Sequence, residues 1–162
     1  MAVLKLHLEE FDEVDYELIA IHSSLEDFRL AYFINQKLPI ILSRNKDEVA
    51  VTVKEGDAFF SKYTYEDEKT ACNWSLIQNK NDIYITQKNT KQNLFLNSTD
   101  LISQKVFLIS EHKKVDYFLK IENNASDINI ENIVDQLKQI ERISAVYSLI
   151  PENIKSKNNL IF

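Results

Sequence analysis

The sequence predicts an α+β fold, in which a mixed, mostly antiparallel sheet carries two helices. Apolar residues recur at helical spacing in two distant stretches, residues 25–38 and 130–141. Between them, short apolar stretches alternate with turns rich in Asn, Asp and Lys, which is typical of antiparallel strands. We therefore expect strand-helix-strand units at both ends of a β-meander.

The N-terminal elements are two predicted strands and a helix. Residues 3–8 alternate leucines with polar residues, which predicts a strand with one buried face, and residues 14–21 are dense in apolar side chains. Residues 23–26 have the Ser-x-x-Glu pattern of a capping box, which predicts the start of a helix. Pro39 is expected to end this helix, since its ring cannot continue the helical backbone.

The remaining strands follow in a regular order. The predicted meander has strands at residues 40–43, 49–53, 58–65, 71–77, 83–87 and 94–96. Three more strands are predicted at residues 105–109, 115–121 and 143–149, with the second helix before the last of them. This order predicts that both helices pack on one face of the sheet through β-α-β crossovers.

The length of 162 residues fits a single domain, residues 1–162, which can bury a core without a disulfide or a metal ion. Residues 151–162 form a C-terminal tail that ends in Leu160, Ile161 and Phe162. We expect this tail to dock on its own sheet as an added strand. The alternative is that it presents a short apolar peptide to a partner.

Charge and cysteine content favour a soluble, cytoplasmic protein. The formal net charge of −6 opposes direct contact with nucleic acid, which needs clustered Lys and Arg. The longest apolar stretches are far shorter than a membrane span of about 20 residues, so no membrane contact is expected. Cys72 is the one cysteine, so no intramolecular disulfide can form.

The sequence lacks the usual motifs of catalysis. Gly56 is the one glycine, which excludes the phosphate-binding loop, the dinucleotide fingerprint and the nucleophile elbow. The three histidines are isolated, and Cys72 in an alternating strand is expected to be buried rather than nucleophilic. We therefore expect no cofactor, no metal ion and no catalytic residue, with an enzyme of another type as the open alternative.

Residues 109–117, Ile-Ser-Glu-His-Lys-Lys-Val-Asp-Tyr, resemble the signature of the IPExxxVDY family of small bacterial proteins. Ser110 stands where that family has proline. Residues 22–32 and 155–162 also resemble the family. The resemblance implies a cytoplasmic protein and no particular activity. Genes of the family often lie near those for ribonuclease III and pyruvate kinase, which implies a cytosolic housekeeping context. A role as an accessory to an RNA-processing enzyme is an alternative that depends on this gene context alone.

A Val-Asp-Tyr sequence occurs twice, at residues 14–16 and 115–117. Each Val-Asp-Tyr sequence begins a predicted strand. If these two strands are neighbours and begin at the same edge of the sheet, their polar residues form a patch near the start of the first helix. The candidate patch residues are Asp15, Tyr16, Glu26, Asp27, Arg29, Glu111, Asp116 and Tyr117. The alternative is structural, with the aspartate accepting backbone hydrogen bonds and the tyrosine packing its ring.

Three functions are compatible with these patterns. The first is a non-catalytic protein-interaction or accessory module of a cytosolic complex, which binds a protein through the patch or the tail. The second is a small-molecule-binding regulatory domain, because residues 115–150 resemble half of a ferredoxin-like regulatory domain. The third is the accessory role in RNA processing, reached through protein contacts.

Overall fold

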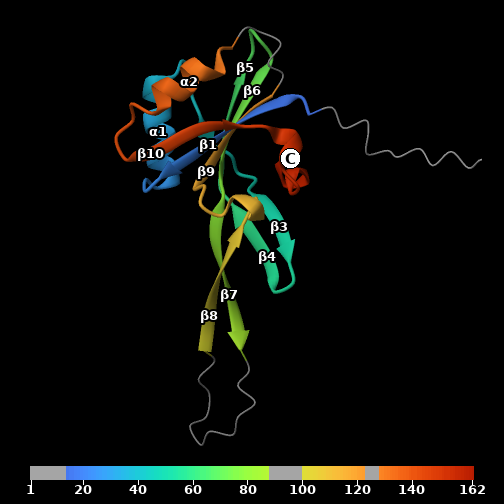
Figure 1. The fold of residues 1–162 in the computed structure, drawn as a ribbon. Coiled ribbons are helices and arrows are strands. Elements are labelled where there is room, and N and C mark those ends of the chain that lie inside the picture. Colours follow the sequence, from blue (N-terminus) through green and yellow to red (C-terminus); the bar gives the residue numbers. More distant parts are fainter. Residues whose placement is uncertain (1–13, 88–99, 123–127) are drawn as a thin grey trace, which may run out of the picture.

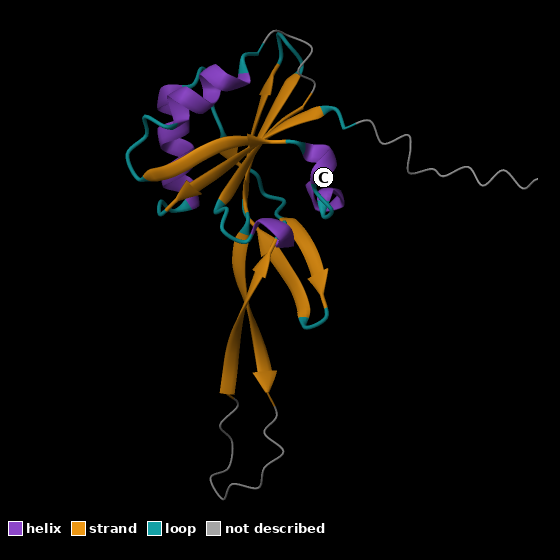
Figure 2. Cartoon of the chain, viewed as in Figure 1, coloured by secondary structure: helices purple, strands orange, loops and turns teal. Residues whose placement is uncertain are grey.

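The computed structural model describes residues 14–87, 100–122 and 128–162, which form two helices and ten strands (Figures 1 and 2). The predicted strands at residues 3–8 and 94–96 lie outside the described residues. No helix in the described ranges combines the length and apolar character needed to cross a bilayer. The α+β class is confirmed.

The main sheet has six strands, and every strand pair in the described residues is antiparallel. Across the sheet the order is β10 (Ile143–Leu149), β1 (Tyr16–Ser23), β9 (Tyr117–Glu122), β6 (Cys72–Gln78), β5 (Lys62–Asp67) and β2 (Ser43–Arg44). The mostly antiparallel prediction is confirmed, but no adjacent parallel pair is found among these strands. The strands expected on either side of the second helix are β9 and β10. They are not neighbours, because β1 lies between them and pairs with both in the antiparallel direction.

Both helices cover one face of this sheet (Figure 1). Helix α1 (Asp27–Lys37) contributes Leu30 and Ile34 to the core beneath it, and α2 (Ile130–Leu137) contributes Ile133 and Leu137. In each helix the two residues are four apart, so they lie on the same side. The predicted burial of Cys72 is confirmed on this face.

The capping box predicted at residues 23–26 is wrong. Glu26 is the N-cap of α1, and no side chain caps the helix. Ser23 still belongs to β1, where its hydroxyl donates to the carbonyl oxygen of Arg142 at 2.9 Å and accepts from the amide of Leu25 at 3.1 Å. The Ser23 hydroxyl therefore bonds to groups that precede or lie outside α1, and it does not accept from an amide in the first turn of the helix.

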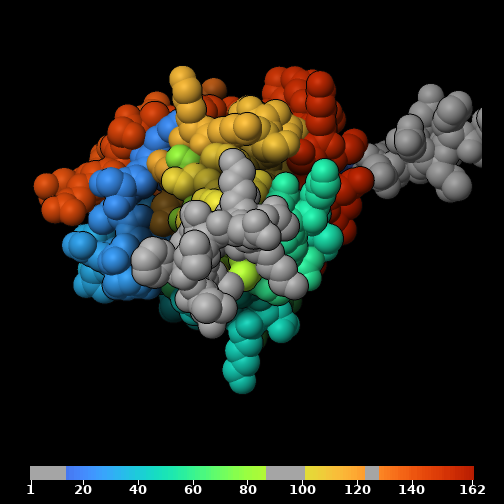
Figure 3. Space-filling view, turned by 90° about the horizontal axis from the view of Figure 1, so that it is seen from below, coloured from blue at the N-terminus to red at the C-terminus, as the bar shows by residue number. Residues whose placement is uncertain are grey.

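The other face of the sheet has a second core. It is covered by the hairpin of β3 (Val49–Val53) and β4 (Gly56–Phe60) and by the C-terminal tail. In Figure 3 the teal hairpin and the red tail lie on one side of the molecule and the blue atoms of α1 on the other. The tail forms two 3-10 turns, η3 (Pro151–Asn153) and η4 (Lys157–Leu160), so the added strand predicted there is wrong.

The predicted meander is divided among three sheets. The single strand expected at residues 58–65 breaks at Ser61 into β4, which pairs with β3, and β5, which joins the main sheet. The reason is that Ala58 and Phe60 of β4 are buried in the second core, whereas β5 pairs with β6 in the main sheet.

The third sheet is a two-stranded ribbon of β7 (Lys80–Gln87) and β8 (Asp100–Phe107), which projects away from the main sheet (Figure 1). Its base is held by Asn79, which is fully buried between β6 and β7. The Asn79 amide group donates to the carbonyl oxygens of His112 and Val115 and accepts from the amide of Ile109. The ribbon therefore leaves the body from a fixed junction.

Candidate functional site

Asp116 lies at this junction and joins three segments of the chain. One carboxylate oxygen accepts from the backbone amide of Ser23 at 2.9 Å, and the other accepts from Lys80 Nζ at 2.7 Å. Its own backbone amide donates to the carbonyl oxygen of Ile21. Asp116 thus fixes the end of β1 against the first residue of the ribbon.

The neighbouring residues of the Val-Asp-Tyr sequence are also structural. Val115 is buried in the second core. The Tyr117 hydroxyl donates to the carbonyl oxygen of Leu25 at 2.7 Å, just before α1 begins. Burial, with the nearby charges of Asp27 and Asp116, raises the pKa of Tyr117 well above its ordinary value, so the hydroxyl keeps its proton. These contacts correspond to the structural alternative for residues 115–117.

Asp15 and Tyr16 lie far along the sheet from Asp116 and Tyr117. The prediction that the two Val-Asp-Tyr sequences form one polar patch is therefore wrong. The strands are neighbours, but they are antiparallel, with Tyr16 opposite Glu122 and Ile21 opposite Tyr117. The two Val-Asp-Tyr sequences are therefore at opposite ends of the pair. The Tyr16 hydroxyl is buried and has no hydrogen-bond partner in the described part of the chain.

The acidic start of α1 does come close to Tyr117, as the charges of Asp27 and Glu26 act on its hydroxyl. Asp27 also faces Arg44, with 3.8 Å between the carboxylate and the guanidinium. Arg29 is exposed and has no ion pair with a described residue. The structure therefore places the charges of Glu26 and Asp27 near the Tyr117 hydroxyl, whereas Arg29 has no such relation to it.

Glu111 holds the C-terminal tail. Its carboxylate accepts from the amide of Ser156 at 2.8 Å and from the Ser156 hydroxyl at 2.7 Å. Partial desolvation acts to raise the pKa of Glu111, but the hydrogen bonds to Ser156 and nearby amides outweigh it and lower the pKa to about 2. Leu160 is fully buried, whereas Ile161 is 70% exposed. The apolar end of the tail is thus divided between core and surface.

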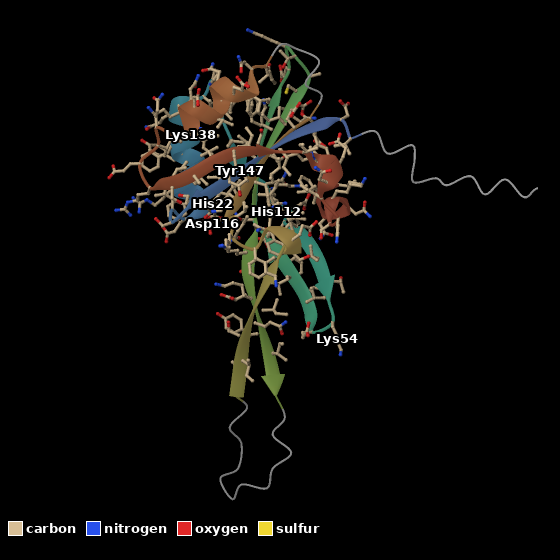
Figure 4. The ribbon with its side chains drawn as sticks, viewed as in Figure 1. His22, Lys54, His112, Asp116, Lys138 and Tyr147 are labelled. Carbon is tan, nitrogen blue, oxygen red and sulfur yellow. The ribbon has the colours of Figure 1, made fainter. Side chains whose placement is uncertain are left out.

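A histidine and a tyrosine meet near the junction. His22 Nε2 lies 2.9 Å from the Tyr147 hydroxyl, and Figure 4 shows both on the same part of the molecule as Asp116. In the ranges that the structure describes, no group of three or more His, Cys, Asp or Glu side chains could hold a metal ion. Burial, with a contribution from Asp67, raises the pKa of the Cys72 thiol, which opposes the thiolate that a nucleophile needs.

The outer half of the ribbon presents apolar side chains to solvent. We call residues 83–86 of β7 and residues 101–104 of β8, which pair with each other, the distal ribbon. Tyr84 is 72% exposed and Leu101 is 68% exposed, and both lie on one face, since Tyr84 pairs with Ser103 and Thr86 with Leu101. Sequence reasoning missed this site, because alternating apolar residues predict a strand without showing which strand lacks a cover.

A scan against protein-family models finds no matching family, and searches of curated proteins and solved structures give no significant match. The functional argument therefore depends on the geometry of the chain itself.

Proposed function

We propose that this protein is a non-catalytic interaction module of a cytoplasmic complex, and that it binds its partner protein through the distal ribbon. The observation that carries the proposal is the exposure of Tyr84 and Leu101 on a ribbon that projects from the body. A two-stranded ribbon is at best marginally stable in water, so an apolar one gains stability when a partner covers it.

The partner class follows from the edges of the ribbon. In the described residues β7 and β8 pair only with each other, so each has one edge of unpaired backbone groups. Such edges are normally protected by charged side chains or proline. Residues 83–86 and 101–104 contain neither. We infer that the partner contributes an extended segment that adds to one of these edges, while its side chains cover Tyr84 and Leu101.

We also propose an architecture and a family for the chain. The two strand-helix-strand units are β1-α1-β2 and β9-α2-β10, and the ribbon lies between them in the sequence. The proposed family is the bacterial IPExxxVDY family. An accessory role to an RNA-processing enzyme is one form of this function. The net charge of −6 then favours contact with the protein component rather than with RNA.

Photo-crosslinking tests the proposal directly. A photoreactive phenylalanine analogue replaces Tyr84 or, in a second variant, Leu101, in cells that make the protein naturally. Ile41 is the matched control position, because it is 73% exposed but lies before β2 on the main sheet. We expect both ribbon positions to give the same single protein adduct and the control position to give none. Leu101→Lys, combined with the analogue at residue 84, should abolish the adduct.

Two results would contradict the proposal. One is the absence of any specific adduct at both ribbon positions in protein that is folded. The other is an adduct between two copies of this chain, recognised by its doubled mass, since that would make the ribbon a dimer interface instead.

A further inference from the structure

The sheet face opposite the helices is apolar where the second core lies, around Ile77 and Phe118, and becomes polar toward the other end of β5, β6 and β9. Strand register arranges its side chains in three rows across β5, β6 and β9. The rows are Glu66-Asn73-Glu122, then Thr64-Ser75-Lys120, then Lys62-Ile77-Phe118. Carboxylates therefore lie at one end of this surface and a lysine at the other.

Lys120, in the middle row, is buried but has partners. Its ammonium group donates to the carbonyl oxygen of Leu160 and forms an ion pair with Glu122. It also lies over the rings of Tyr16 and Phe162, at 4.8 Å and 4.6 Å from the ring centroids. The positive charge of Lys120 is thus compensated within the protein.

Lys62 differs from Lys120 in this respect. Lys62 as a whole is only 9% exposed, and its ammonium group has no carboxylate or hydrogen-bond acceptor among the described residues. The ammonium group lies over the ring of Phe162, 4.5 Å from the centroid. The nitrogen itself is not enclosed, since the Tyr16 hydroxyl is the one buried side-chain N or O atom without a hydrogen-bond partner among the described residues. Lys62 can therefore pair with an anionic group that enters from solvent.

A hollow of about 250 Å³ lies beside Lys62. Its wall includes Lys62, Thr64, Glu66, Asn73, Ser75 and Phe162. Sites for drug-sized ligands are typically larger, at roughly 300–1,000 Å³, so this hollow suits a molecule of a few heavy atoms. The hydroxyl and amide groups supply hydrogen bonds, and the ring of Phe162 supplies an apolar wall.

We propose that this hollow binds a small zwitterion with one carboxylate and one ammonium group, as in a free amino acid. The carboxylate of the ligand pairs with Lys62. The ammonium group faces Glu66, which lies at the exposed rim and has no ion pair with a described residue. The carboxylates of Glu66 and Glu122 line the same hollow, so they repel a dianion such as phosphate.

Calorimetric titration of the intact protein with the common free amino acids tests this site. For each amino acid that binds, the acid without its amino group and the amine without its carboxylate serve as matched probes. We expect at least one amino acid to bind saturably and to raise the melting temperature, while its two matched probes bind at least tenfold more weakly.

Two variants and a control locate the binding. Lys62→Met removes the ammonium group with little change in volume, and Glu66→Gln removes the rim carboxylate; each should weaken binding at least tenfold. Lys138 follows α2, on the other side of the sheet from the hollow, so Lys138→Met should leave binding unchanged. Thermal unfolding verifies that each variant folds.

The proposal is overturned if no amino acid binds the wild-type protein. It is also overturned if the matched acid binds as tightly as the amino acid, or if binding survives Lys62→Met. None of these results bears on the distal ribbon, which lies on a different part of the molecule, so the two proposals fail independently.

Discussion

The Asn79 side chain is fully buried and forms three hydrogen bonds of 2.8–2.9 Å, to His112, Val115 and Ile109. Its backbone groups are also paired, with the carbonyl oxygen of Asp116 and the amide of Leu108. An asparagine in a polar stretch of sequence predicts a turn. Here the same residue type instead connects both strands of the ribbon to the main sheet.

We expect Asn79→Ala to lower the free energy of unfolding by about 2–4 kcal/mol. The substitution leaves the buried amide of Ile109 and the carbonyl of Val115 without their side-chain partner, and each unsatisfied group costs about 1–3 kcal/mol. Urea unfolding measures the change. Asn153→Ala, at an exposed asparagine, is the control and should change it by less than about 0.5 kcal/mol. Equal effects of the two substitutions would contradict the role given to Asn79.

Individual polar residues were the least predictable part of the candidate site. Asp116 and Tyr117 were predicted as candidates, and their structural alternative could be formulated from residue type alone. Their separation from Asp15 and Tyr16 could not, because strand direction depends on pairing partners that are distant in sequence. Lys120, between Leu119 and Ile121, alternates with apolar neighbours as a surface lysine would, so its burial depends on the tail that covers it.

Among the elements, the C-terminal tail depends on a titratable contact. Glu111 has a pKa of about 2 in the folded protein, below its ordinary value of 4.5. A carboxylate with a lowered pKa stabilises the fold fully above the ordinary value, and this contribution is lost as the pH falls toward the folded value. The contact between Glu111 and Ser156 is therefore strong at neutral pH and weakens between about pH 4.5 and 2.

The matched prediction compares Glu111→Gln with the wild type. Their difference in melting temperature should be constant from pH 7 to pH 5 and should shrink as the pH falls toward 2, because protonation removes the charge that the substitution removes. Glu55→Gln, in the exposed turn between β3 and β4, should have a small effect at every pH. A difference between Glu111→Gln and the wild type that does not change with pH would contradict the assigned contact.

The elements with a strong hydrophobic period were predicted best. The strand expected at residues 143–149 is β10 with the same bounds, and the second helix begins at Ile130 as expected. It ends earlier, at Leu137, because the following residues form a turn that leads to Arg142, whose φ is positive at 70°. The break at Ser61 could not be predicted, since apolar residues on both sides continue the same alternation.

The whole molecule has an uneven distribution of packing, which predicts uneven stability. Strands β1 and β9 lie inside the six-stranded sheet, with a core on each face. The distal ribbon has no strand beyond β7 and β8 in the described residues and exposes Tyr84 and Leu101. Amides in weakly packed segments open without global unfolding, whereas those of a central strand exchange only through it.

Hydrogen exchange followed by mass spectrometry checks this distribution. In the isolated protein, peptides that contain residues 101–104 should exchange at least a hundredfold faster than peptides that contain residues 117–122. The crosslinked complex should protect the first set and leave the second unchanged, which separates partner binding from general stabilisation. Equal protection of the two segments in the isolated protein would contradict the exposed ribbon.

Both neighbours of β1 come from the last third of the chain: it pairs with β9, from Tyr117, and with β10, from Ile143. During synthesis on the ribosome, this early and largely apolar strand therefore waits for partners that emerge about a hundred residues later. Contacts so distant in sequence form slowly, and an unpaired apolar strand is prone to aggregate. The nascent chain thus needs protection, by chaperones or by rapid translation, until residue 149 has emerged and the sheet can close.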